Sequence, residues 1–198
     1  MSKTIRHLLV LSGPLAIGKS YTEQQILSGQ LNHLEPLAKL YQVQSWVKLT
    51  PATYLQEWGE KRLPEFALFH YELTRLITRP GYSLTDFAKD PGLEIANRAE
   101  DVSVITLWAP GIVIAERMQR RKPLGARLRE VIRPNRRYEA AGQLYQDPEA
   151  FSQLYRAWKN YWQQITSAEL FFWEVSASLP IFLPKDEFVK RLGNAAGA

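Results

Sequence analysis

The chain has 198 residues, of which 45% are hydrophobic, and a formal net charge of +5 at pH 7. These values fit one domain that buries a full core, and the lack of Cys excludes disulfides and a thiol nucleophile. The three His residues are scattered and offer no obvious set of zinc ligands. No apolar run is long enough to cross a bilayer and the first residues do not resemble a signal peptide, so we expect a cytoplasmic protein without membrane contact.

Predicted strands and helices alternate along the chain. Continuous apolar runs predict buried strands, and apolar residues at helical spacing predict helices. The region 52–77 has mainly helical spacing, with a break expected around Gly59 and Pro64. Strands are predicted at 4–12, 42–49, 82–87, 102–108 and 170–175, and helices at 20–31, 52–77, 93–98, 111–121, 148–165 and 185–192.

This alternation predicts an α/β fold with about five parallel strands and helices on both faces. Ligands of such sheets bind outside the C-terminal ends of the strands. The predicted helix at 148–165 has an apolar stripe, which we interpret as core rather than as a platform for stacking bases. The stripe consists of Phe151, Leu154, Tyr155, Trp158, Trp162 and Ile165.

A glycine-rich loop joins the first predicted strand to the first predicted helix. Residues 13–20 match the phosphate-binding pattern G-x-x-x-x-G-K-[ST]. Gly13 and Gly18 allow backbone conformations and close approach that a Cβ would block. The loop amides would surround the phosphates, Lys19 would reach the outer two, and the Ser20 hydroxyl would bind magnesium. The predicted nucleotide contacts of this region are Gly13, Ala16, Ile17, Gly18, Lys19, Ser20 and Thr22.

Phosphoryl transfer also needs a carboxylate for the metal or for the attacking hydroxyl. Asp86 lies near the C-terminal end of the predicted third strand, so we predict it as the catalytic and metal-binding carboxylate. Asp101, Asp90 and Glu94 are weaker candidates, and the alternative for Asp86 is a solvated turn residue.

Basic residues concentrate between positions 117 and 137, where nine basic residues and one acidic residue give a net +8 and leave −3 for the remainder. Such local charge indicates a site rather than a generally basic surface. We predict an Arg-rich lid over about 117–147, in which Arg117 and Arg121 stabilise the transferring charge and Arg120 contacts the nucleotide. A solvated basic face is the alternative. The surplus of charge over one triphosphate also suits a polyanion such as DNA.

The layout resembles the P-loop nucleoside and nucleotide kinases over nearly the whole chain. Residues 9–14 with Gly18-Lys19-Ser20 are similar to the opening of guanylate kinases, whose downstream acceptor motifs are missing here. Residues 104–110 and 115–121 resemble the strand, acidic helix and lid entry of thymidylate kinase-like enzymes. The resemblance implies ATP and Mg²⁺ as cofactors, and it places Ser176 in a backbone segment that passes over the adenine ring.

The chain departs from the thymidylate kinase-like pattern where that family binds its acceptor. The strand-end Asp-Arg pair of the family appears as Asp86 followed by Phe87, and its Arg-Glu-Pro appears as residues 49–51, Leu-Thr-Pro, with Lys48 as the remaining cation. An acceptor without a 5′-phosphomonoester therefore fits better. With the surplus basic charge, the pattern resembles the phage kinases that phosphorylate 5-hydroxymethyluracil in DNA during thymine hypermodification.

The sequence thus predicts an ATP-dependent kinase that transfers the γ-phosphate to a hydroxyl of a nucleoside-type acceptor, with 5-hydroxymethyluracil in DNA as the preferred acceptor. One alternative is a kinase for free nucleosides or nucleoside monophosphates. Another alternative is a regulatory or DNA-handling ATPase.

Overall fold

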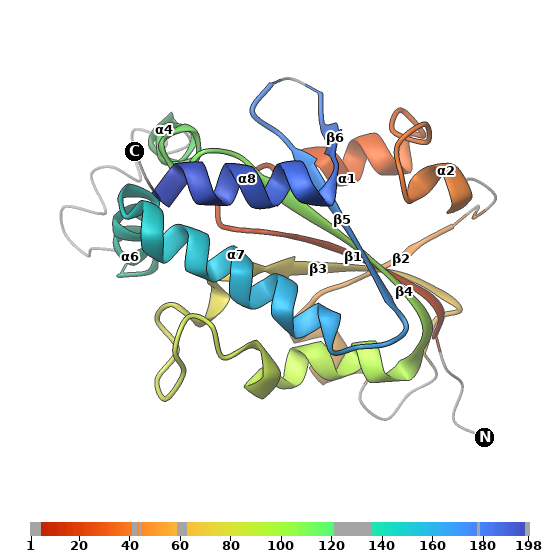
Figure 1. The fold of residues 1–198 in the computed structure, drawn as a ribbon. Helices are drawn as coiled ribbons and strands as arrows, with labels where there is room; N and C mark the ends of the chain where they lie inside the picture. The colour runs from red at the N-terminus through yellow and green to blue at the C-terminus, as the bar shows by residue number, and fades with distance from the viewer. Residues whose placement is uncertain are drawn as a thin grey trace.

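The computed structural model describes residues 5–40, 43, 45–58, 63–120, 136–177 and 179–196, and its centre is one β-sheet (Figure 1). In the described part of the chain the strand order is β2-β3-β1-β4-β5-β6. The first five of these strands pair in parallel, and β6 pairs antiparallel to β5. The strands are β1 (Ile5–Gly13), β2 (Val47–Leu49), β3 (Phe66–Glu72), β4 (Ala99–Trp108), β5 (Ala168–Glu174) and β6 (Ile181–Leu183).

Helices connect the strands. The α-helices are α1 (Lys19–Leu27), α2 (Leu37–Leu40), α3 (Pro51–Thr53), α4 (Gly111–Arg120), α6 (Arg136–Gln146), α7 (Pro148–Gln163) and α8 (Lys185–Ala196). A π-helical turn, η1 (Tyr54–Trp58), follows α3, and three 3-10 helices follow β3: η2 (Leu73–Leu76), η3 (Phe87–Lys89) and η4 (Pro91–Arg98). The chain is therefore an α/β protein with a six-stranded, mostly parallel sheet in the described residues.

Both faces of the sheet are covered, as neighbouring residues of β5 show. Side chains of successive strand residues point to opposite faces. Phe172 stacks on Phe188 of α8 with ring centroids 3.8 Å apart, whereas the indole of Trp173 donates to the carbonyl of Glu35, before α2. Helices α7 and α8 therefore lie on one face, and the segment between α1 and α2 lies on the other.

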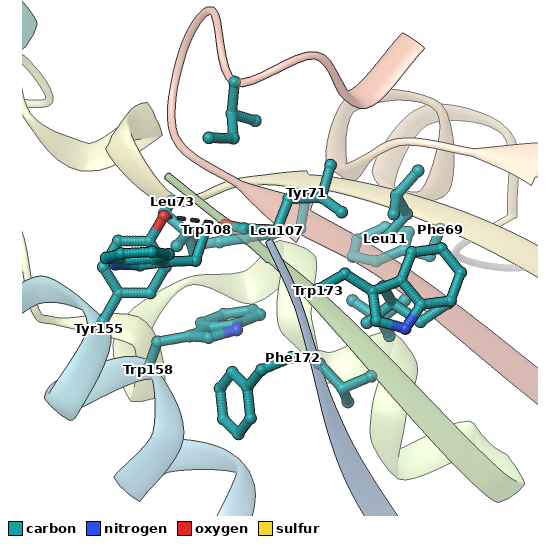
Figure 2. Close-up of a cluster of buried hydrophobic side chains, with 14 of the residues drawn as sticks. Leu11, Phe69, Tyr71, Leu73, Leu107, Trp108, Tyr155, Trp158, Phe172 and Trp173 are labelled. Carbon is teal, nitrogen blue, oxygen red and sulfur yellow. Dashed lines mark hydrogen bonds between the residues drawn. The ribbon is translucent and has the colours of Figure 1, made fainter. Parts of the chain in front are cut away.

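The stripe of α7 forms the aromatic centre of the core, as predicted. Tyr155 donates from its hydroxyl to the carbonyl of Leu107 (Figure 2). The indole of Trp158 donates to the hydroxyl of Thr106, so α7 lies against β4. Trp158 also stacks on Tyr71 of β3 at 5.0 Å. Of the predicted stripe, only Ile165 is not fully buried.

Several predicted elements are confirmed in position: the strands at 4–12, 102–108 and 170–175, and the helices at 111–121, 148–165 and 185–192. The predicted helix at 20–31 ends earlier, at Leu27, and the predicted strand at 42–49 shrinks to Val47–Leu49. The short helix predicted at 93–98 is part of the 3-10 helix η4.

Two predictions are wrong. The region predicted as helical over 52–77 contains β3, which pairs with β1 from His7 to Gly13. The strand predicted at 82–87 is absent, since residues 82–86 form turns that lead into η3. The run Phe-Ala-Leu-Phe-His-Tyr at 66–71 has apolar residues at both helical and strand spacing, and a short buried strand cannot be told from a helix by spacing alone. Asp86 consequently does not lie at a strand end.

Candidate active site

The loop between β1 and α1 lies at the point where the strand order reverses. β1 pairs with β3 on one side and with β4 on the other. After β1, the next two strands along the chain lie on the β3 side of β1, and the later strands lie on its β4 side. In open parallel sheets, the crevice at the C-terminal end of such a strand is where ligands bind.

The loop needs glycine at both ends, for different reasons. Gly18 has φ +112°, where an L-residue is strained, although in the described part of the chain no atom beyond its chain neighbours would lie within 4 Å of a Cβ at this position. Gly13 has no such φ, but a Cβ would lie 2.8 Å from Cγ2 of Ile17 and 3.3 Å from Cβ of Leu107. Ala16 also has positive φ, at +66°. The loop is thus tightly wound against the ends of β1 and β4.

Several polar groups of the loop are available to a ligand. Within the described residues, no backbone hydrogen bond uses the amides of Ala16, Gly18 or Ser20. The side chain of Ser20 is exposed in the first turn of α1, where the helix dipole favours an anion. The ammonium of Lys19 donates to the carbonyls of Gly13 and Pro14, over 2.9 and 2.8 Å. The loop and the first turn of α1 therefore carry three such amides, a hydroxyl and an ammonium close together.

Leu15 is held from both sides by side chains from distant parts of the chain. Its amide donates to the hydroxyl of Thr74 in η2, and its carbonyl accepts from the hydroxyl of Tyr145 in α6 over 2.7 Å. Burial and the nearby carboxylate of Glu72 raise the pKa of Tyr145, so its hydroxyl stays protonated and donates. The loop is therefore fixed both to η2, directly after β3, and to α6.

Glu72 is the carboxylate at the C-terminal end of β3. Its register partner in β1 is Gly13, so the two backbones are about 5 Å apart. Glu72 accepts from the hydroxyl of Thr74 over 2.7 Å and forms an ion pair with Arg137 at the start of α6. This strand-end carboxylate stands where the sequence analysis placed Asp86.

A cavity of about 310 Å³ opens beside the loop. One wall comes from the loop and α1, another from the connection between β5 and β6, and Arg117 of α4 lies between them. The lining residues are Ile17, Gly18, Tyr21, Thr22, Arg117, Val175, Ala177 and Pro180. The lining is mostly apolar and lies within reach of the loop amides, which suits a flat ring attached to an anionic group.

A second polar cluster lies between α1 and the sheet. Glu23 of α1, buried to 8% exposure, pairs with Lys48 of β2 at 2.7 Å and lies 3.4 Å from His70 of β3. Burial lowers the pKa of His70 to about 4, against the opposing effect of Glu23. His70 is therefore neutral at pH 7, and Glu23 compensates the charge of Lys48.

The structure brings most of the predicted nucleotide contacts together. Gly13, Ala16, Ile17, Gly18, Lys19, Ser20 and Thr22 share the loop and the first turn of α1. Ser176 lies in the β5–β6 connection, where its carbonyl accepts from Arg117 and its hydroxyl donates to Glu174.

Other predicted residues lie elsewhere. Asp86 accepts from the amide of Ser83 and the ammonium of Lys89, which together lower its pKa and make it a local turn residue. Arg120 is 81% exposed and pairs with Glu116. Arg121 and the rest of 121–135, about half of the predicted lid, lie outside the described residues.

Each of the three weaker candidates for the carboxylate lies in a different environment. Asp90 is buried, with Arg75 at 2.9 Å, Arg79 at 3.5 Å and the hydroxyl of Tyr71 at 2.8 Å. Asp101 pairs in register with His7 at the start of β4, at the opposite edge of the sheet from the loop. Glu94 is exposed on η4.

Glu72 and Thr74 were not predicted because β3 was not predicted, whereas Arg137 and Tyr145 of α6 fell within the predicted lid without an assigned role. Had residues 66–72 been recognised as a buried strand, Glu72 would have been found as the first acidic residue at its C-terminal end. No local signal marks Tyr145, whose contact with Leu15 spans 130 residues of sequence.

Neither the models of known protein families nor the curated proteins contain a match to this chain. Among the described residues, none of the helices combines the length and apolar character needed to cross a membrane. The same residues contain no group of three or more His, Cys, Asp or Glu side chains arranged to hold a metal ion.

Proposed function

We propose that the chain is a P-loop phosphotransferase that moves the γ-phosphate of ATP to a hydroxyl of a nucleoside-type acceptor. The observation that carries the proposal is the juxtaposition of the β1–α1 loop with the cavity beside it. The loop has amides outside the backbone hydrogen bonding at Ala16, Gly18 and Ser20, and the cavity of about 310 Å³ starts at Ile17 and Gly18. A triphosphate on the loop would extend its base into this cavity.

The side chains at the loop fit Mg²⁺ and a triphosphate. The exposed hydroxyl of Ser20 is an oxygen ligand of the kind that magnesium takes beside phosphates, and the metal would neutralise charge on the β- and γ-phosphates. Lys19 lies against the carbonyls of Gly13 and Pro14, at the entrance of the loop, and would turn to the outer phosphates.

We assign the proton-accepting role to Glu72. The acceptor oxygen forms a bond to the γ-phosphorus, the bond from that phosphorus to the β–γ bridging oxygen breaks, and its electron pair leaves with ADP. The hydroxyl proton passes to the carboxylate of Glu72, which is level with Gly13 at the sheet edge. Arg137, paired with Glu72, brings positive charge to the same place.

The charge around β2 favours an acceptor without a phosphomonoester. Lys48 is the remaining cation of the segment that binds the acceptor in thymidylate kinase-like enzymes, and Glu23 neutralises it at 2.7 Å. We therefore propose 5-hydroxymethyluracil in DNA as the preferred acceptor, with the surplus basic charge of residues 117–137 directed to the DNA backbone.

Transfer of labelled γ-phosphate tests both the proposed phosphotransferase activity and the proposed acceptor. The acceptor panel contains DNA with 5-hydroxymethyluracil, the same DNA with thymine, the free hydroxymethylated nucleoside, thymidine and thymidine monophosphate. Label should enter only the hydroxymethylated DNA, and a rise in salt should weaken the reaction steeply. Rapid labelling of free nucleosides or monophosphates with inert DNA would establish the small-molecule alternative. Hydrolysis of ATP that ignores every acceptor would establish an ATPase.

The two carboxylates give opposite outcomes in the same assay. Glu72→Gln should lower kcat by ~100-fold or more while the affinity for MgATP changes little. Asp86→Asn, which alters a turn residue bonded to Ser83 and Lys89, should leave kcat within about 2-fold. The reverse result would return the catalytic role to Asp86.

A further inference from the structure

Arg117 connects the two walls of the cavity. From the last turn of α4, its Nη1 donates to the carbonyl of Ile17 over 3.2 Å. Its Nη2 donates to the carbonyls of Val175 and Ser176. Ile17 belongs to the β1–α1 loop, whereas Val175 and Ser176 begin the β5–β6 connection. In the described residues, no backbone hydrogen bond joins these two walls directly.

The connection depends on the shape of the guanidinium. Its planar fork directs donors to carbonyls on two sides at once, which a lysine ammonium on a single stem does not reproduce. Hydrogen bonds from a charged donor are also stronger than those between neutral groups. Since Arg117 donates to backbone carbonyls on both sides of the cavity, its position is set by protein groups of both walls.

We propose that Arg117 is a positioning residue that couples the phosphate-binding loop to the wall of the nucleobase cavity. The proposal rests on the proposed function, because it takes the loop as the phosphate site and the cavity as the base site. Affinity for the base portion of a nucleotide then depends strongly on Arg117, whereas affinity for the phosphates alone depends on it only by the factor with which a bound phosphate stabilises the far wall. A ligand that touches only the loop also stabilises the far wall, through the guanidinium.

Amide hydrogen exchange on the unmodified protein tests the coupling directly. Magnesium tripolyphosphate, which has no base, should slow exchange in the loop at 13–20 and also, by up to about 2-fold, in the connection at 174–181. Protection confined to the loop would overturn the coupling. This measurement needs no variant, so it decides the matter even if a substitution at position 117 prevents folding.

Calorimetric titration of Arg117→Lys tests the consequence for binding. The variant should bind MgATP about 10-fold more weakly, which corresponds to one lost hydrogen bond from a charged donor, and tripolyphosphate within about 2-fold of the unmodified protein. The remote protection at 174–181 should also disappear. Arg156→Lys is the matched control, because Arg156 lies on the surface of α7 with 47% exposure and pairs with Glu149.

The outcomes separate this inference from the proposed function. An equal loss of affinity for both ligands would assign Arg117 to the phosphates, and unchanged binding of both would remove it from the site. Either result overturns the coupling and leaves the proposed function standing. An unmodified protein that binds neither MgATP nor tripolyphosphate overturns both.

Discussion

From the left-handed conformation of Gly18 we predict by how much Gly18→Ala weakens the binding of phosphates. At φ +112° an alanine is strained, but no atom of the described residues beyond its chain neighbours lies within 4 Å of the position that its methyl group would take. Gly18→Ala therefore isolates backbone strain from steric overlap. Strain of this kind costs about 1–3 kcal/mol.

The strain would lower either the stability of the protein or its affinity for phosphates. If the loop keeps its shape, the protein loses about 1–3 kcal/mol of stability, a decrease in Tm of roughly 2–4 °C per kcal/mol for a chain of this size. If the loop instead relaxes, stability is retained and the cost is transferred to binding, which weakens about 5- to 150-fold. Gly18 lies three residues beyond Leu15, where Thr74 and Tyr145 fix the loop. Because the amides of Ala16 and Ser20 on either side of Gly18 take part in no backbone hydrogen bond among the described residues, we expect relaxation of this end of the loop and weaker binding of magnesium tripolyphosphate.

Gly81→Ala is the matched control. Gly81 also has positive φ, at +80°, and also faces open space, but it lies in the turn between η2 and η3. The control variant should lose about 1–3 kcal/mol of stability and bind tripolyphosphate normally. Calorimetry with urea unfolding measures both quantities. Normal binding by Gly18→Ala, or an equal loss of binding in Gly81→Ala, would refute the reasoning.

Three further predictions concern the site and the core. Lys19→Ala should abolish phosphate transfer, whereas Lys39→Ala, an exposed residue paired with Glu35, should leave it intact; equal effects in the labelling assay would contradict the assignment. Since the pKa of His70 is about 4 when folded and near 6.5 when unfolded, the unfolded chain binds the proton first as pH falls. The stability that the neutral, buried His70 contributes is fully present above pH 6.5 and is lost by about 1.4 kcal/mol per pH unit as pH falls towards 4; urea unfolding of His70→Gln should show a flatter profile. Trp158→Ala should cost about 3–5 kcal/mol in the same assay, because the ring is fully buried and stacks on Tyr71, and a smaller loss would mean that the core collapses around the site.

The sequence predicts those parts of the site whose residues lie close together along the chain. The loop from Gly13 to Ser20 is such a part, since glycine spacing, lysine and the helix start all lie within eight residues. β3 is a different case, because its apolar residues face both layers and fit two periodicities equally. Because of this ambiguity the third strand was predicted at 82–87, and the candidate carboxylate was placed at its end, at Asp86. β6 has only three residues between Pro180 and Pro184, too few to show any periodicity.

The conformation of the loop, in contrast to its presence, depends on contacts that no local pattern contains. Thr74 holds the amide of Leu15 from 59 residues away, and Tyr145 holds the carbonyl from 130 residues away. Because both polar groups of Leu15 are already bonded to the protein, the loop does not have to order itself around a ligand. Ordering a backbone residue costs about 1–2 kcal/mol, so a loop fixed in advance leaves more of the interaction energy for binding. Thr74 also donates to Glu72, and α6 carries both Tyr145 and Arg137. The same contacts that fix the loop therefore fix the carboxylate beside it, which is what the proposed transfer between a bound phosphate and an incoming hydroxyl requires.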